Sequence, residues 1–160
     1  MPPVKLGIPE LKAFMQSHGI RGEILQLHVP TPTVETAAQA VNATPAQIIK
    51  SILFMVDEQP ILAIACGLST IGRRAIADLY NVGKKRVRLA TPKQVLEISG
   101  YEVGAMPPFG HRQALSTLID RRVLEVPEAY AGGGAENALM RLSPHDIQRV
   151  TGAKILDLLG

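Results

Sequence analysis

The chain has 160 residues, of which 46% are hydrophobic and 19% charged, a composition typical of a globular protein rather than a disordered one. The net charge of +3 permits a nucleic-acid partner, but the 4% aromatic content argues against a surface that stacks many bases. A single cysteine, Cys66, excludes a disulfide framework and a multi-cysteine zinc site. No apolar run could span a membrane, and residues 1–5 lack a secretory pattern, so we expect one cytoplasmic domain over residues 1–160 without membrane association.

Five helices are predicted from helical spacing of apolar residues and from start and stop signals. In the first of them Leu11, Phe14 and Met15 share one face, and Gly19 follows its end. A hydroxyl residue followed by proline, as at Thr91 and Ser143, is typical of a helix start. The predicted helices are 9–18, 34–41, 71–80, 92–98 and 144–151.

Eight strand-like segments lie between these helices: 23–29, 49–56, 61–66, 86–89, 118–120, 124–125, 139–142 and 155–157. Residues 57–60 separate two of them as a hairpin turn, and the stretches 100–110 and 132–134 are predicted loops because glycine and proline concentrate there. Helices and strands mix without strict alternation. This pattern indicates a mixed α/β (α+β) fold with a mixed or antiparallel sheet and packed helices.

Lys50 interrupts an apolar strand that runs from Ile48 to Val56. A cation is costly in a desolvated position unless it meets an anion. One interpretation places Lys50 on the outer face of an edge strand, pointing to solvent, and the residues alone favour it. The other places its ammonium against a phosphate or carboxylate of a ligand.

The loop 100–111 is the second candidate site, because its glycines allow close approach to a ligand and its prolines hold it rigid. Its free N–H groups could bind a carbonyl or a developing oxyanion. His111 is the one histidine that adjoins this loop. The run Gly132-Gly133-Gly134 could cradle a phosphate, although a hairpin tip is the simpler interpretation because no Walker motif follows.

Other chemistry is not indicated. The four histidines show no metal-ligand spacing, and no serine or cysteine has the context of a nucleophile, so we expect no metal, no cofactor and no covalent catalysis. The basic run Lys84-Lys85-Arg86 is either a solvated turn or a contact to a phosphate backbone.

Four blocks in this order resemble the YbaK/prolyl-tRNA synthetase-associated domain family over nearly the whole chain. They are residues 33–38, residues 47–54, residues 104–110, and Gly132-Gly133 followed by residues 142–144. The resemblance implies a distorted, barrel-like sheet and hydrolysis, in trans, of the ester that joins a wrong amino acid to a tRNA. The partners it implies are a mischarged tRNA and an aminoacyl-tRNA synthetase.

The resemblance also assigns residues. The functional lysine of the family falls on Lys50, and its Gly-x-x-x-Pro loop falls on Gly104 and Pro108; these three are the predicted catalytic residues. The predicted substrate-binding residues are Thr33, Ser51, Met106, Pro107, Phe109, Gly110, His111, Gly132 and Gly133. Lys84, Lys85 and Arg86 are the predicted nucleic-acid contacts. An aspartate that some members carry after the glycine loop is absent here, where residues 138–140 read Ala-Leu-Met, so a substrate preference that depends on it does not transfer.

Two alternatives stay open: a non-catalytic nucleic-acid-binding module, and a regulatory partner that docks on a synthetase. The deacylase hypothesis predicts that Lys50 lies in the wall of a pocket that Gly104 and Pro108 also line.

Overall fold

The computed structural model describes residues 4–159; residues 1–3 and 160, which belong to the predicted domain and partly to the segment searched for a secretory signal, lie outside it. In the described part five α-helices are present, in agreement with the five predicted. They are α1 (Ile8–Ser17), α2 (Val34–Ala40), α3 (Arg73–Tyr80), α4 (Pro92–Ser99) and α5 (Pro144–Thr151). Three short 3₁₀ turns, at Pro45–Gln47, Lys84–Arg86 and Arg121–Glu125, complete the helical elements.

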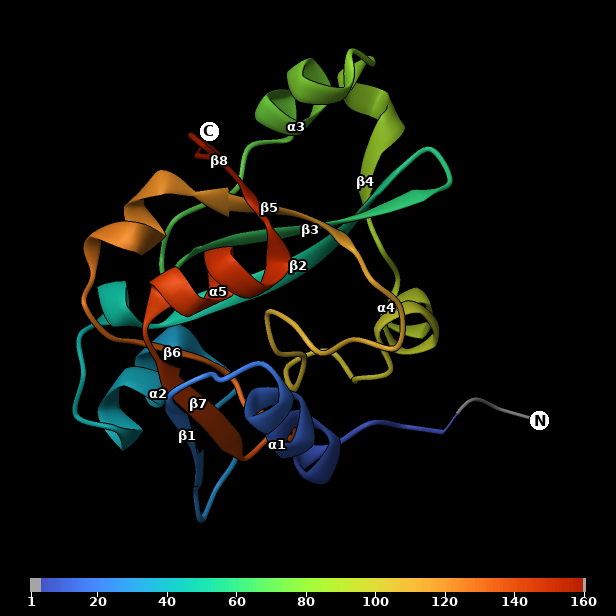
Figure 1. Ribbon diagram of the computed structural model, residues 1–160. Coiled ribbons are helices and arrows are strands. Elements are labelled where there is room, and N and C mark those ends of the chain that lie inside the picture. Colours follow the sequence, from blue (N-terminus) through green and yellow to red (C-terminus); the bar gives the residue numbers. More distant parts are fainter. Residues whose placement is uncertain (1–3, 160) are drawn as a thin grey trace.

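The strands form two sheets (Figure 1). They are β1 (Gly22–Gln26), β2 (Ile49–Val56), β3 (Gln59–Cys66), β4 (Val87–Leu89), β5 (Ser116–Asp120), β6 (Ala129–Gly132), β7 (Ala138–Leu142) and β8 (Lys154–Leu156). The larger sheet has the order β4-β2-β3-β5-β8 and mixes antiparallel with parallel pairs, while the smaller sheet, β1-β7-β6, is antiparallel. The mixed α+β fold is therefore confirmed.

The barrel-like arrangement is open in the described residues, because the strands pair as two sheets and not as a closed barrel. A single parallel bridge between Ile48 and Tyr130 links them, so β6 lies beside the start of β2. In Figure 1 α1 lies beside the smaller sheet and α3 lies at the β4 end of the larger one.

Two of the predicted helix starts owe their position to a side-chain cap. The hydroxyl of Thr33 accepts a hydrogen bond from the amide of Thr36 at 3.1 Å, and the hydroxyl of Thr91 accepts one from the amide of Gln94 at 3.2 Å. These bonds satisfy amides that the first turn of a helix leaves without a partner. The side chain of Ser143 makes no such bond, so the proline at the first position of α5 is the one predicted start signal that acts there.

Two strand predictions need correction. The segment Leu124–Glu125 is not a strand but lies in a 3₁₀ turn, at the start of which the carboxylate of Asp120 accepts a hydrogen bond from the amide of Arg122. Two apolar residues are too few to distinguish a strand from a turn. Strand β6 was not predicted, because Ala-Tyr-Ala-Gly contains one strong strand former and is held in place by its antiparallel partner β7.

Side chains of β2 alternate between two apolar cores. Ile49 and Leu53 point into the core that also holds Met106 and Phe109, whereas Phe54 and Val56 point into the core beneath α3. Alternation is the ordinary consequence of strand geometry. The larger sheet is thus buried on both faces where β2 pairs with β3 and β4.

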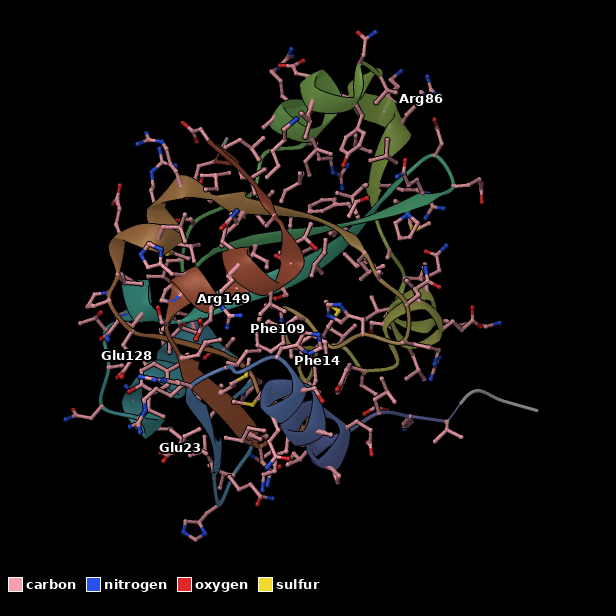
Figure 2. All side chains as sticks on the ribbon, in the orientation of Figure 1. Phe14, Glu23, Arg86, Phe109, Glu128 and Arg149 are labelled. Atoms are coloured by element: carbon pink, nitrogen blue, oxygen red, sulfur yellow. The ribbon has the colours of Figure 1, made fainter. Side chains whose placement is uncertain are left out.

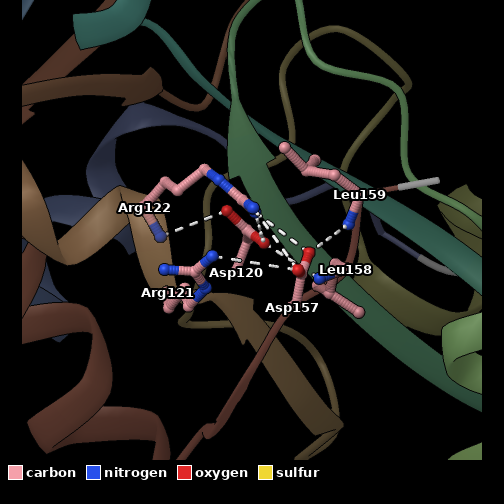
Figure 3. A network of polar contacts seen from close by, with 6 residues as sticks. All are labelled: Asp120, Arg121, Arg122, Asp157, Leu158 and Leu159. Carbon is pink, nitrogen blue, oxygen red and sulfur yellow. Dashed lines mark hydrogen bonds and ion pairs between the residues drawn. The ribbon is translucent and has the colours of Figure 1, made fainter.

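A polar network fastens the end of the chain to β5 (Figure 3). The fully buried carboxylate of Asp120 accepts hydrogen bonds from the Arg122 amide and guanidinium and from the Leu158 amide, at 2.9–3.1 Å. Arg122 also pairs with Asp157, and its hydrogen bond is the main cause that lowers the pKa of Asp157. A buried carboxylate with three donors is stable where an unpaired one would be costly.

Candidate functional site

A cavity of about 470 Å³ opens between β2, β6, α2 and α4; we call it the edge cavity. Its wall is mostly apolar, as is usual for small-molecule sites. The lining residues are Thr31, Pro32, Thr33, Val34, Ala37, Ile48, Ile49, Lys50, Ser51, Ile52, Leu53, Leu89, Ala90, Pro92, Val95, Val103, Gly104, Met106, Tyr130, Ala131, Gly132 and Leu139.

Six of the predicted site residues line this cavity together: Thr33, Lys50, Ser51, Gly104, Met106 and Gly132. They come from four separate parts of the chain, namely the start of α2, strand β2, the loop after α4 and the end of β6. Pro107, Pro108, Phe109, Gly110, His111 and Gly133 do not line it.

Lys50 is half-buried in the cavity wall, and its ammonium donates a hydrogen bond to the carbonyl oxygen of Ser69. Burial lowers the pKa of Lys50, since removing the ammonium from water disfavours its charged form. Over residues 4–159 no carboxylate pairs with it. The position therefore does not match a lysine that simply points to solvent, and it leaves a cation able to receive an anionic or strongly polar group of a ligand.

The loop that follows α4 presents main-chain donors to the same cavity. Gly104 is exposed and has a φ of +89°, a conformation that favours glycine. Within the described chain, the amides of Gly104 and Met106 donate to no protein acceptor, whereas the amide of Ala105 between them donates to the carbonyl of Glu102. Gly104 and Met106 both line the edge cavity, so their two N–H groups are candidates to bind a carbonyl oxygen placed there.

The glycines of the β6–β7 hairpin explain how this loop is held. A Cβ on Gly132 would collide with the carbonyl oxygen of Met106, so only glycine lets the loop pass this close to β6. The amides of Gly133 and Gly134 donate to the carbonyls of Ala138 and Ala105, at 3.2 and 2.9 Å. These amides are already used within the chain, so the geometry supports the hairpin interpretation of the glycine run rather than a phosphate cradle.

The rest of the predicted loop is packed behind the cavity wall. Pro107, Pro108 and Phe109 are buried, and Phe109 stacks on Phe14 of α1 with 5.3 Å between ring centroids (Figure 2). The Nε2 of His111 donates to the carbonyl of Pro107 at 2.7 Å, since a carbonyl can only accept. Burial lowers the pKa of His111. These contacts hold the loop in shape.

Sequence reasoning missed the apolar part of the wall, which Val34, Leu89, Pro92 and Val95 contribute from three elements. Leu89 and Val103 are large hydrophobic residues that stay 52% and 61% exposed at the cavity. An exposed apolar residue at the end of a strand is by itself a weak indication of a binding site. Nothing in the local sequence pattern indicates that residues 34 and 95 line the same cavity.

The predicted nucleic-acid contacts lie outside the edge cavity. Lys84, Lys85 and Arg86 form an exposed 3₁₀ turn, and Figure 2 shows Arg86 beside α3, far from Glu23 and Glu128. Arg86 pairs with Asp57 through two hydrogen bonds, and this contact lowers the pKa of Asp57. Strand β4 connects the turn to Leu89 at the cavity rim.

Within residues 4–159 no group of three or more histidine, cysteine, aspartate or glutamate residues could hold a metal ion. The same part of the chain contains no helix that is both long and apolar enough to cross a membrane.

The chain is similar to known proteins over most of its length. The model of the aminoacyl-tRNA editing domain matches residues 28–150. YwhH, an uncharacterized protein of Bacillus subtilis (strain 168), is 24% identical over 134 residues, covering 83% of each chain. A proline–tRNA ligase of Geobacillus sp. (strain WCH70) is 26% identical over 80% of this chain, but the match spans only 22% of the ligase.

Solved structures show the same fold. A protein proposed to be a trans-editing enzyme for prolyl-tRNA synthetase has a TM-score of 0.88 and 30% identity, and the match covers 96% of both chains. The hypothetical protein APE2540 has a TM-score of 0.87 and 27% identity, with 94% of this chain and 99% of that one covered. With a family model that matches most of its length, this chain belongs to the aminoacyl-tRNA editing domain family.

Proposed function

We propose that this protein is a hydrolase that removes a wrong amino acid from tRNA, acting in trans on the ester of a mischarged aminoacyl-tRNA. The observation that carries the proposal is the edge cavity, which is lined by the half-buried Lys50 and by Gly104 and Met106, whose amides have no acceptor among residues 4–159. The relatives among proline–tRNA ligases and the trans-editing neighbour support a substrate related to prolyl-tRNA.

The reaction needs little from the protein, because an aminoacyl ester is already reactive. Water attacks the carbonyl carbon, the bond from that carbon to the ribose oxygen breaks, and the products are the free amino acid and a tRNA with its terminal hydroxyl restored. Placing the ester and stabilising the oxyanion are the main requirements. The neighbouring ribose hydroxyl can assist the proton transfer, so no protein nucleophile is required.

The proposed roles follow from position. Lys50 holds the terminal phosphate or ribose of the tRNA, because among the described residues its ammonium has a single, neutral partner, the carbonyl oxygen of Ser69. The free amides of Gly104 and Met106 face the carbonyl oxygen as it becomes negative. Pro108 and His111 act on this loop from behind the wall, so we assign them to positioning rather than to contact with the substrate.

The apolar wall sorts amino acids by size and polarity. Leu53, Val95 and Met106 offer no charge to a bound side chain. Leu139, which also lines the cavity, belongs to the segment 138–140, where some family members carry an aspartate. Sorting by one methylene changes the free energy of binding by only about 1–3 kcal/mol, which is why synthetases need a separate editing step.

The test is ester loss from a panel of mischarged and correctly charged tRNAs, measured against the spontaneous rate. We expect one or a few mischarged species to be hydrolysed and the correctly charged ones to be spared. Binding without ester loss would support the non-catalytic module instead, and tight binding of a synthetase without either would support the docking partner.

A further inference from the structure

The edge cavity lies against the edge of strand β2, not against one of its faces. A strand that shows one face to a pocket contributes every second residue to it. Here all residues from Ile48 to Leu53 line the cavity in unbroken succession. Side chains from both faces therefore border it, and the main chain of β2 forms the wall between them.

The neighbours of β2 leave a gap at this point. The amide of Ala90 donates to the carbonyl of Leu53, and the amide of Asp57 donates to the carbonyl of Arg86, so odd-numbered residues of β2 turn their N–H and C=O groups toward β4. By alternation Ser51 turns its own pair to the same side.

Over residues 4–159, no strand pairs with Ser51 on the β4 side of β2. Continuing the β4 register by two residues beyond Ala90 reaches Pro92, which has no N–H and already begins α4. At the other end β6 lies beside the start of β2, where a bridge joins Ile48 to Tyr130. Over the described residues, no loop or side chain bonds to the main chain or to the hydroxyl of Ser51.

We infer that the aminoacyl group of the substrate adds to β2 as a single residue of an extra antiparallel strand, paired with the main chain of Ser51. An aminoacyl ester has the required groups in the required order, because its α-ammonium is a donor and its carbonyl is an acceptor on adjacent carbons. The ammonium donates to the carbonyl of Ser51, and the amide of Ser51 donates to the ester carbonyl, as in a hydrogen-bonded ladder pair. This inference rests on the proposed function and specifies how its substrate is held.

The direction of such a strand agrees with the other groups of the site. An antiparallel residue opposite Ser51 continues toward Lys50, so the ribose that follows the ester carbonyl lies beside that lysine. Paired residues of an antiparallel ladder carry their side chains on one face, so the amino-acid side chain follows that of Ser51 toward Val95 and Met106. In the other direction the bond from Ala90 to Leu53 closes the ladder two residues beyond Ser51, so only the position opposite Ile52 lies between that bond and the ammonium.

The closed end predicts that the site requires a free α-amino group. Acetylating that nitrogen removes its charge and adds a group opposite Ile52, where the register places Thr91 at the start of α4. With the best substrate of the tRNA panel, we expect N-acetylation to slow enzymatic ester loss by at least tenfold, after correction for the spontaneous rate. Equal enzymatic rates for the free and the acetylated substrate would overturn the inference while leaving the deacylase proposal intact.

Two variants of Ser51 separate its main chain from its side chain. Ser51→Ala removes the hydroxyl and keeps the N–H, so its loss of rate should be smaller than that of Ser51→Pro. Ser51→Pro removes the N–H, which no ladder bond uses on this side, and should cost on the order of tenfold or more, about the effect of one hydrogen bond to a polar group. An equally large loss in Ser51→Ala would assign the role to the hydroxyl and contradict the main-chain pairing.

A binding measurement covers the case in which the proline variant does not fold or the wild type does not hydrolyse. The probe is 3′-aminoacylamino-3′-deoxyadenosine, prepared with each amino acid of the tRNA panel; its amide replaces the labile ester, and its N-acetyl form and adenosine are the controls. In ¹⁵N-labelled wild-type protein the amide resonance of Ser51 should shift with the probe alone. A shift without hydrolysis on any tRNA would reject the deacylase and keep the pairing, whereas hydrolysis without the shift would reject the pairing.

Discussion

The two halves of β2 have opposite roles although they belong to one strand. From Leu53 to Val56 the strand is paired on both edges and its side chains are 2–5% exposed. From Lys50 to Ile52 it is paired on one edge only, its side chains are half-buried, and the edge cavity lies against it. The site exists where the partner strand β4 ends, so stability and function should respond to mutations in different halves.

The largest expected effect is on the paired half. Phe54→Ala should lower the free energy of unfolding by about 3–5 kcal/mol, because the ring is 3% exposed and its loss leaves a cavity in the core beneath α3. Phe54 does not line the edge cavity, so the deacylation rate per folded molecule should be unchanged. Denaturant unfolding and a rate measured at low temperature test both parts. A folded variant with a greatly reduced rate would mean that the two halves are coupled.

The next effect belongs to the open half. Lys50→Ala should leave the melting temperature nearly unchanged and cost on the order of 2–4 kcal/mol in transition-state stabilisation, or roughly 30- to 1000-fold in rate. The cause is loss of a charge-assisted contact to the tRNA terminus.

Lys50→Met is the matched control, because it keeps most of the aliphatic stem and removes only the charge. It should be as inactive as the alanine variant, and a near wild-type rate in either would remove the lysine from the mechanism. His111→Ala should cost less, since His111 bonds to the Pro107 carbonyl behind the wall. If His111→Ala were the inactive variant, general-base catalysis by histidine would be the better account.

The same contrast explains how much of the fold could be predicted. Thr33 and Thr91 predict the starts of α2 and α4, because a helix cap is a local interaction within four residues. Strand β6 could not be predicted, since its four residues are held by β7 and by the bridge from Tyr130 to Ile48, far away in the sequence.

The candidate site divides in a similar way. Lys50 could be singled out because a cation in an apolar strand is conspicuous in the sequence. The reason why position 132 requires glycine could not be predicted, because the atom that excludes a side chain there is the carbonyl oxygen of Met106 on another loop. The gap opposite Ser51 depends on where β4 ends, which no local pattern reveals.

A smaller effect is expected at the basic turn that precedes β4. If Lys84 and Lys85 contact tRNA phosphates, the Lys84→Ala/Lys85→Ala variant should flatten the slope of log affinity against log salt by about 0.7–0.9 per lost contact. Arg86→Ala should change the slope less, because Arg86 is held by Asp57.

Fluorescence anisotropy with labelled tRNA between low and moderate salt measures these slopes, and Arg73→Ala/Arg74→Ala on the exposed start of α3 is the comparison for general basic charge. An unchanged slope in the Lys84→Ala/Lys85→Ala protein would mean that the turn is solvated and does not contact tRNA. The open half of β2 would then be the place where the tRNA binds.

The smallest effect concerns the hydroxyl of Tyr101, which lies in the same apolar core as Ile49 and Leu53 of β2. The hydroxyl of Tyr101 is buried and has no hydrogen-bond partner among the described residues, and burial, with a smaller contribution from the charge of Glu10, raises the pKa of Tyr101 to about 12. Tyr101→Phe removes the unpaired hydroxyl and should raise the free energy of unfolding by about 1 kcal/mol at pH 7.

The sign of the pH dependence follows from proton binding. An unfolded chain releases the tyrosine proton near pH 10, whereas the folded protein keeps it until about pH 12, so the unfolded state binds fewer protons in this range. Wild-type stability should therefore fall more steeply than that of Tyr101→Phe as the pH rises from about 10 to 12, and the two curves should run parallel below pH 9. Because Tyr101 does not line the edge cavity, the deacylation rate at pH 7 should stay the same. A less stable phenylalanine variant would mean that the hydroxyl has a partner in solution, and parallel curves up to pH 12 would mean that the ring is accessible to water in the native state.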